Sequence, residues 1–210
     1  KTLFTEALLQ TGKIKPYSSM FTKGEVALAK KGFELGKKYI QYVPIAFSRY
    51  PETIKKTTEL DAFLVTVAPM DKYGYFNLGT NGDYAIELAR HAKKLIIEVN
   101  QNMPRTGGNT ILHISEVDHI VENTVPILEE ASRPATELDK IIGQHIIHLI
   151  PNGATIQMGI GGVPNAVCEQ LIHHQDLGIH TEVITSGMID LIQKGVVTNA
   201  KKTLHPYRNV

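Results

Sequence analysis

A glycine-rich turn and a carboxylate in the C-terminal part of the chain have residue types and a spacing that suit chemistry. The turn, residues 159–162, follows a β-prone run at 154–158, and Glu182 ends a second β-prone run at 177–182. Backbone amides of such a turn can stabilise negative charge. A carboxylate beside them can act as a base or a nucleophile. The order strand, turn, helix, strand predicts that both features lie at neighbouring strand ends, where open α/β sheets bind ligands.

Three interpretations of the turn remain open from spacing alone. It can bind an anion or an acyl oxygen, it can begin a dinucleotide-binding fingerprint, or it can be a tight turn that binds nothing. Pro164 stands where the fingerprint has its third glycine, which disfavours a dinucleotide. Glu182 likewise has a simpler interpretation, as a solvated residue at a strand end.

The remaining reactive residue types indicate no second site. We expect Cys168 to be a small buried apolar residue on the helix that follows the turn. The pairs His145 and His148, and His173 and His174, lack the accompanying ligands that mark a metal site, so we expect no metal. The sequence contains neither a Gly-x-Ser-x-Gly nucleophile motif nor a Walker loop.

The composition is that of an ordinary globular protein and gives no sign of a charged partner. Of 210 residues, 42% are hydrophobic and 20% charged, and the net charge is +1. We therefore expect neither nucleic-acid nor membrane-surface binding, and no apolar run is long enough to span a bilayer. A single cysteine rules out an internal disulfide bond and fits a reducing compartment, so we expect a cytoplasmic protein.

The apolar pattern predicts an α/β protein with mostly parallel open sheets flanked by helices. Nearly continuous apolar runs at 60–68 and 95–99 predict strands buried on both faces, joined through a helix at 84–94 whose last turn holds Lys93 and Lys94. Loops are expected at 69–83 and 100–109. Other predicted elements are a strand at 39–45 and helices at 24–35, from Pro134 to 150, and at 188–194. A change of pattern near 129–134 divides the chain into domains 1–131 and 132–210.

Four segments together give the chain its resemblance to a known family. They are 69–79 (PMDKYGYFNLG), 98–104 (EVNQNMP), 157–164 (QMGIGGVP) and 177–182 (LGIHTE). In this order and spacing the sequence resembles the acetyl-CoA hydrolase/CoA-transferase family, and within it the 4-hydroxybutyrate CoA-transferases. The resemblance implies two related open α/β domains with the active site between them.

The resemblance also implies roles for individual residues. Glu182 matches the nucleophilic glutamate, and Gln157, Gly159, Gly161 and Gly162 match the loop that binds the oxyanion and the CoA thioester. From their loop positions we expect Phe76, Asn77, Asn100 and Met103 to shape an acyl pocket. Coenzyme A would be a substrate, with no permanently bound cofactor. An acyl-CoA and a carboxylate would be the partners, in a protein that is a homo-oligomer, most simply a dimer.

Members of this family are longer than this chain, so both predicted sheets are expected to be incomplete. We therefore expect this stretch by itself to be poorly soluble and inactive. Three functions remain as hypotheses besides CoA transfer: acyl-CoA hydrolysis on the same scaffold, non-catalytic ligand binding by an α/β module, and dinucleotide binding.

Overall fold

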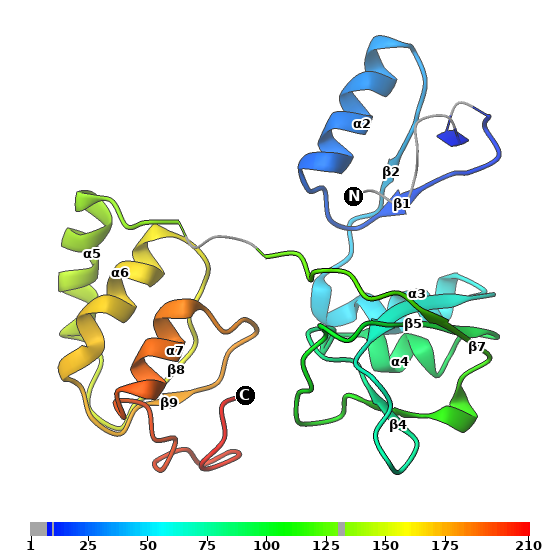
Figure 1. Cartoon of the computed structure of the whole chain (residues 1–210). Coiled ribbons are helices and arrows are strands. Elements are labelled where there is room, and N and C mark those ends of the chain that lie inside the picture. The colour runs from blue at the N-terminus through cyan, green and yellow to red at the C-terminus, as the bar shows by residue number, and fades with distance from the viewer. Residues whose placement is uncertain (1–7, 10, 130–132) are drawn as a thin grey trace. The chain divides into compact units, whose positions relative to one another are not determined.

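The computed structural model describes residues 8–9, 11–129 and 133–210. The chain divides into two compact units, Lys1–Ile127 and Leu128–Val210, which are described separately (Figure 1). Helices and parallel strands occur in both units, which confirms the predicted α/β class. The predicted boundary between residues 131 and 132 lies outside the described residues, and the assignment of domains stays a prediction.

The first unit begins with a strand pair and a helix. Strands β1 (Tyr17–Ser18) and β2 (Gln41–Tyr42) pair in parallel, and α2 (Lys23–Glu34) lies between them in the sequence. Thr22 precedes α2 and forms a capping box with Glu25, which satisfies amide donors at the helix start. The helix agrees with its prediction, whereas the strand predicted at 39–45 is confined to two residues.

A three-stranded parallel sheet forms the centre of this unit. Its order is β3 (Phe63–Val67), β5 (Leu95–Val99) and β7 (His119–Glu122), with Phe63 opposite Leu95 and Ile97 opposite Ile120. Helix α4 (Ala85–Ala89) connects β3 to β5 and buries its apolar side chains against them. The predicted strand–helix–strand unit is thus confirmed. The apolar core of the unit consists of Val67, Phe76, Leu78, Ala85, Ile86, Ala89, Leu95, Ile97, Val99 and Leu112.

Two predictions about this sheet are wrong. Strand β3 lies at the sheet edge and is not buried on both faces, since Leu64 is 63% exposed. Helix α4 ends at Ala89, so Lys93 and Lys94 do not lie in its last turn. The backbone has already turned toward β5, and Lys93 forms ion pairs with Glu59 and Asp61, whereas Lys94 pairs with Asp118 at 2.7 Å.

Short elements fill the connections of the first unit. The predicted loop at 69–83 contains a strand, β4 (Tyr75–Asn77), which pairs antiparallel with β6 (Ile111–His113). The other short elements are the 3₁₀ helices η1 (Phe47–Arg49) and η2 (Ile114–Glu116), and helix α3 (Tyr50–Thr57). Strands of this length carry too little periodicity to be predicted from sequence.

The second unit contains the glycine-rich turn and Glu182. Its elements are α5 (Glu137–Ile147), β8 (Thr155–Ile156), α6 (Gly162–Gln170), η3 (Leu171–His173), β9 (Gly178–Ile179) and α7 (Ser186–Gln193). Strands β8 and β9 pair in parallel. Side chains from these strands and from α6 and α7 form the core: Ile156, Val167, Cys168, Leu171, Leu177, Ile179, Met188, Leu191, Val196 and Val197.

Helix α5 begins later than Pro134, contrary to prediction. Thr136 is the N-cap residue, and its hydroxyl and backbone N–H both donate to Asp139 Oδ2, at 2.7 and 2.8 Å. Since this capping box satisfies the start of the helix, Pro134 lies outside it.

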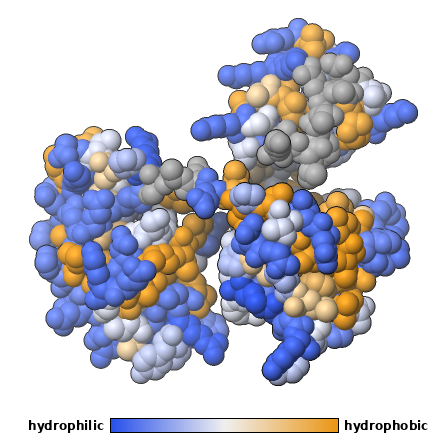
Figure 2. Space-filling model, in the orientation of Figure 1, coloured by the Kyte–Doolittle hydropathy of each residue, from blue (hydrophilic) through white to orange (hydrophobic). Residues whose placement is uncertain are grey.

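Apolar side chains reach the surface of both units, and Figure 2 shows them interspersed with hydrophilic residues on the face drawn. On α5 the exposed apolar residues include Leu138, Ile141 and Ile142. Within the described residues, no helix is long and apolar enough to cross a membrane.

Candidate functional site

The glycine-rich turn and Glu182 follow two adjacent parallel strands. The His180 N–H donates to the Ile156 carbonyl at 3.0 Å, which continues the β8–β9 ladder toward the C-terminal ends of both strands. Beyond it, the Thr181 hydroxyl donates to the Met158 carbonyl at 3.0 Å and accepts from the Met158 N–H at 3.3 Å. Met158 directly precedes Gly159, and Thr181 directly precedes Glu182. The structure therefore brings the turn and the carboxylate to one edge of the sheet, although Glu182 lies beyond β9 rather than within a strand.

The turn presents backbone donors that the chain itself does not use. Across the described part of the chain, the N–H groups of residues 159–163 form no hydrogen bond, and the first helical bond of α6 runs from the Asn165 N–H to the Gly161 carbonyl. These groups lie at the start of α6, where the helix dipole also favours an anion. An oxyanion or another negatively charged group can therefore be bound here without any basic side chain.

Glycine is required at two positions of the turn for different reasons. Gly161, the N-cap residue of α6, has φ 135° and ψ −177°, a backbone conformation that side chains disfavour. Gly162 is buried, and a Cβ there would collide with the Asp139 carboxylate of α5. The loop shape is thus set by backbone conformation at one residue and by close helix contact at the next.

Glu182 is available for chemistry. Its side chain is exposed and, among the described residues, it has no hydrogen-bond or ion-pair partner. A carboxylate without such partners keeps its lone pairs free to attack a carbonyl carbon. Gln157 is also exposed and lies just before the turn, at the end of β8.

Sequence reasoning missed two residues of this site, Thr181 and Asp139. Thr181 connects the two strand ends through its hydroxyl, a contact with no local sequence signal. Asp139 is half-buried against Gly162, and its hydrogen bonds with the Thr136 hydroxyl and N–H hold its pKa below the ordinary value. The pattern Thr136-x-x-Asp139 before an apolar run is a capping-box signature, so this signal was present in the sequence.

Cys168 and the histidines are not part of the site. Cys168 is buried in the core on α6, which confirms the prediction of a small buried residue on the helix after the turn, and burial raises the pKa of its thiol to about 11. His174 Nε2 bonds the Ile150 carbonyl at 2.9 Å, while His145 and His148 are exposed on and just after α5. The described residues contain no group of three or more side chains suited to hold a metal ion.

The predicted acyl-pocket residues lie in the first unit, where three of them form one buried cluster. The Asn77 amide donates to the Thr106 carbonyl at 2.8 Å and accepts from the Gly79 N–H at 2.8 Å. Met103 packs so closely on Gly79 that a Cβ there would collide with its sulfur, and the Met103 N–H donates to the Asn100 carbonyl. These contacts order the loops after β4 and β5.

The fourth member, Phe76, is 3% exposed and belongs to the apolar core. Asn100 is 1% exposed, and its side chain donates to the Val125 carbonyl. The amide hydrogen-bonding groups of Asn77 and Asn100 are therefore engaged within the protein. An acyl-binding role for the four residues stays a prediction.

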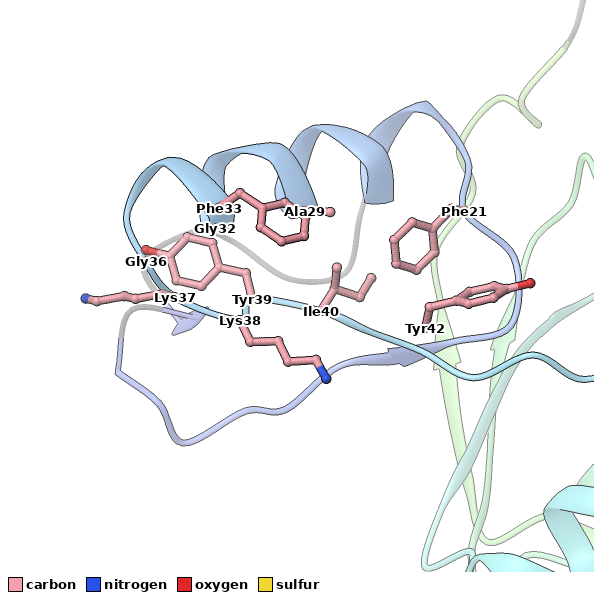
Figure 3. Close-up of a pocket in the computed structure, with 10 residues that line it drawn as sticks. All are labelled: Phe21, Ala29, Gly32, Phe33, Gly36, Lys37, Lys38, Tyr39, Ile40 and Tyr42. Atoms are coloured by element: carbon pink, nitrogen blue, oxygen red, sulfur yellow. The ribbon is translucent and has the colours of Figure 1, made fainter.

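Two cavities of the first unit are not lined by any predicted site residue. One, of about 670 Å³, lies beside α2, and Figure 3 shows Phe21, Ile40 and Tyr42 near it, with Lys37 pointing outward. The other, of about 680 Å³, is lined by residues that include Ile54, Phe63 and Tyr84. Neither contains a carboxylate or thiol that could act as a nucleophile.

Comparison with known proteins identifies the family. Residues 7–129 match the acetyl-CoA hydrolase/transferase N-terminal domain. The chain belongs to the acetyl-CoA hydrolase/transferase family. It is 43% identical over 166 residues to a 4-hydroxybutyrate coenzyme A transferase of Clostridium kluyveri, an alignment that covers 79% of this chain and 39% of the relative.

Two further proteins support the same family and fold. A succinyl-CoA:cyclohexane-1-carboxylate CoA transferase of Geobacter metallireducens is 40% identical over 174 residues, covering 83% of this chain and 40% of that protein. The crystal structure of RipA from Yersinia pestis superimposes with a TM-score of 0.88 at 47% identity, over 92% of this chain and 46% of that one. The chain thus spans about two fifths of the length of these curated relatives.

Proposed function

We propose that the protein is a CoA-transferase that moves CoA between an acyl-CoA and a short-chain carboxylate through a glutamyl-CoA thioester on Glu182. The observation that carries the proposal is the placement of the exposed Glu182 carboxylate beside a turn with unused amide donors, joined through Thr181 and Met158. Family membership, and the names of relatives that act as CoA transferases, support the same reaction and favour it over dinucleotide binding.

The first half of the reaction loads CoA onto the enzyme. The Glu182 carboxylate attacks the thioester carbonyl carbon of the acyl-CoA, the carbon–sulfur bond breaks, and a mixed anhydride and CoA thiolate result. The thiolate then attacks the glutamyl carbon of the anhydride and releases the donor carboxylate. Glu182 is left as a thioester with CoA, and no net proton is consumed.

The second half reverses these steps with a different acid. The acceptor carboxylate attacks the glutamyl thioester, forming a new anhydride and CoA thiolate. The thiolate attacks the acceptor's acyl carbon, which releases the new acyl-CoA and regenerates Glu182. Each addition places negative charge on a carbonyl oxygen, and one preorganised amide donor is typically worth about 3–4 kcal/mol to such a transition state.

Hydrolysis is the second candidate, since the family comprises hydrolases as well as transferases and the Glu182 side chain is exposed. Water in place of the acceptor carboxylate would hydrolyse the glutamyl-CoA thioester, which releases CoA and regenerates the Glu182 carboxylate. The two reactions differ in one measurement: transfer requires an added carboxylate, whereas hydrolysis does not.

The direct test is to incubate the whole protein with acetyl-CoA, digest it with a protease and analyse the resulting peptides by mass spectrometry. A CoA adduct on the peptide that contains Glu182 is expected, and added acetate or butyrate should discharge it. If the adduct is absent, or resides on another residue, the proposed mechanism is wrong. We also propose that the protein acts in the cytoplasm as a homo-oligomer, with CoA as a substrate rather than a resident cofactor.

A further inference from the structure

The segment 197–210 pairs with the free edge of β9 at its two ends, and the residues between these ends lie away from the edge. On the side away from β8, Leu177 pairs in parallel with Val197. Further along, the Thr181 N–H donates to the Val210 carbonyl at 2.6 Å. The intervening residues 199–209 leave the sheet edge, so no backbone carbonyl accepts the Ile179 N–H, and the Ile179 carbonyl receives only a long bond, at 3.4 Å, from the Val210 N–H.

Two buried side chains complete the hydrogen bonding of Ile179. Asn199 Oδ1 accepts the Ile179 N–H at 2.9 Å, and Lys202 Nζ donates to the Ile179 carbonyl at 2.8 Å. Asn199 and Lys202 are only 4% and 6% exposed. The Asn199 amide oxygen thus satisfies the Ile179 N–H, and the Lys202 ammonium gives the Ile179 carbonyl a shorter bond than the one from the Val210 N–H.

Lys202 also ties the departing segment back to the sheet. Its ammonium donates a second hydrogen bond, to the Arg208 carbonyl at 2.6 Å, close to the point where Val210 rejoins β9. The described residues place no carboxylate within ion-pair distance of this ammonium. A buried, unpaired charge is costly, so its hydrogen bonds to carbonyl oxygens must supply the compensation.

The stem of Lys202 needs a glycine beneath it. A Cβ on Gly178 would lie 2.6 Å from Lys202 Cγ and 3.0 Å from Thr155 Oγ1. The segment itself is held in a strained conformation, since Asn199, His205 and Tyr207 have φ angles of 57°, 52° and 61°. Strain of this kind persists only when surrounding contacts over-determine the backbone.

We propose that Lys202 is a positioning residue for Glu182. It clamps residues 199–210 onto the edge of β9, and the clamped segment holds Thr181 through the Val210 carbonyl. Because Thr181 also bonds Met158, the same clamp fixes the glutamate against the amide donors of the turn. The proposal rests on the proposed role of Glu182. In it, a buried lysine that touches no reacting group keeps the Glu182 carboxylate in position beside the turn.

The test compares Lys202→Met, which keeps the stem and removes the ammonium, with Lys201→Met at the exposed neighbouring lysine. In single-turnover experiments on the intact polypeptide, Lys202→Met should form the Glu182–CoA adduct about 10- to 100-fold more slowly, as expected for a misplaced reacting group. The acyl-CoA concentration giving half-maximal rate should change by less than about twofold. Lys201→Met should match wild type in both.

Hydrogen exchange provides a readout that needs no activity. The Ile179 and Thr181 amides should be protected in the wild type and lose protection in Lys202→Met, while the Gly178 and His180 amides, which donate to the Ala154 and Ile156 carbonyls, stay protected. If Lys202→Met fails to fold, Gly178→Ala serves as the second variant, because it displaces the stem and keeps the charge. It should slow adduct formation in the same way.

Several results would overturn the proposal. One is adduct formation at the wild-type rate in Lys202→Met. Another is that Lys202→Met loses substrate binding and rate equally and loses amide protection throughout the unit, because that pattern indicates general destabilisation. Rapid exchange of the Ile179 and Thr181 amides in the wild type would also overturn it. If the wild type forms no adduct, the proposed function fails and the positioning role fails with it, whereas the exchange experiment still reports whether the clamp exists.

Discussion

The Thr181 hydroxyl bonds both backbone groups of Met158, donating to its carbonyl at 3.0 Å and accepting its N–H at 3.3 Å. One side chain thereby extends the β8–β9 pairing past the last backbone bond of the ladder. It connects the residue before the glycine-rich turn with the residue before Glu182. The placement of Glu182 relative to the amide donors of the turn depends on this contact.

Thr181→Val should therefore reduce transfer more than it reduces binding. Valine has nearly the same shape but leaves both polar groups of Met158 without their partner, which should lower the free energy of unfolding by about 1–3 kcal/mol. Steady-state kinetics and thermal melts check both effects. Thr181→Ser keeps the hydroxyl and should retain most activity, and an equally large loss in the serine variant would show that the hydroxyl is not responsible.

Glu182→Gln should lower CoA transfer by at least about 10³-fold, because an amide of the same shape is a poor nucleophile. Since Glu182 is exposed and unpartnered, the melting temperature and circular dichroism spectrum should not change. The assay is exchange of CoA between a donor thioester and acetate. Glu169→Gln, at another exposed acidic residue of this unit, is the matched control, and near-normal turnover in Glu182→Gln would remove this residue from the nucleophile role.

Gly161→Ala should distort the turn, whereas Gly159→Ala should be tolerated. Gly161 has φ 135°, so any Cβ strains the backbone by about 1–3 kcal/mol and redirects the amide donors. A Cβ on Gly159 would meet only Pro164 Cγ at 3.7 Å, an ordinary contact. Turnover and urea unfolding of the two variants should separate them, and equal activity of both would contradict the oxyanion role of the turn.

Cys168 should resist alkylation in the folded protein. Its thiol is buried, and with a pKa of about 11 only about one thiol in 10³ is ionised at pH 8. Iodoacetamide should modify it slowly at pH 8 and rapidly once urea unfolds the chain. Rapid modification without urea would show that the core around α6 opens readily.

Thr136→Ala should destabilise the second unit in a pH-dependent manner. Hydrogen bonds from Thr136 lower the pKa of Asp139, so their stabilising effect is fully present above the unfolded pKa, near 4, and is lost as the pH falls through the lower folded pKa. The difference in melting temperature between wild type and variant should be largest near pH 7 and shrink below pH 4. A difference independent of pH would mean that the Asp139 charge is not involved.

Local sequence patterns determined the main elements of this protein. The apolar runs of β3 and β5 and the amphipathic pattern of α2 each arise from neighbouring residues, so they could be predicted without knowledge of the fold. The turn at 159–162 and its position before α6 were equally local, since glycine and Pro164 specify a strand-to-helix connection. Order along the chain then sufficed to place Glu182 at the same sheet edge.

Only the tertiary structure decided which long-range contacts complete the site, which short strands form and where the helices and strands end. Strands β4, β6 and β7 exist because distant segments satisfy their backbone groups, and Lys93 and Lys94, which lie beyond the end of α4, pair with acidic residues on other segments. The bonds from Thr181 to Met158 and from Lys202 to Ile179 join residues 23 positions apart in each case. Such pairings have no periodicity along the chain, because they depend on where the folded backbone brings each polar group, and that is settled only when the whole sheet forms.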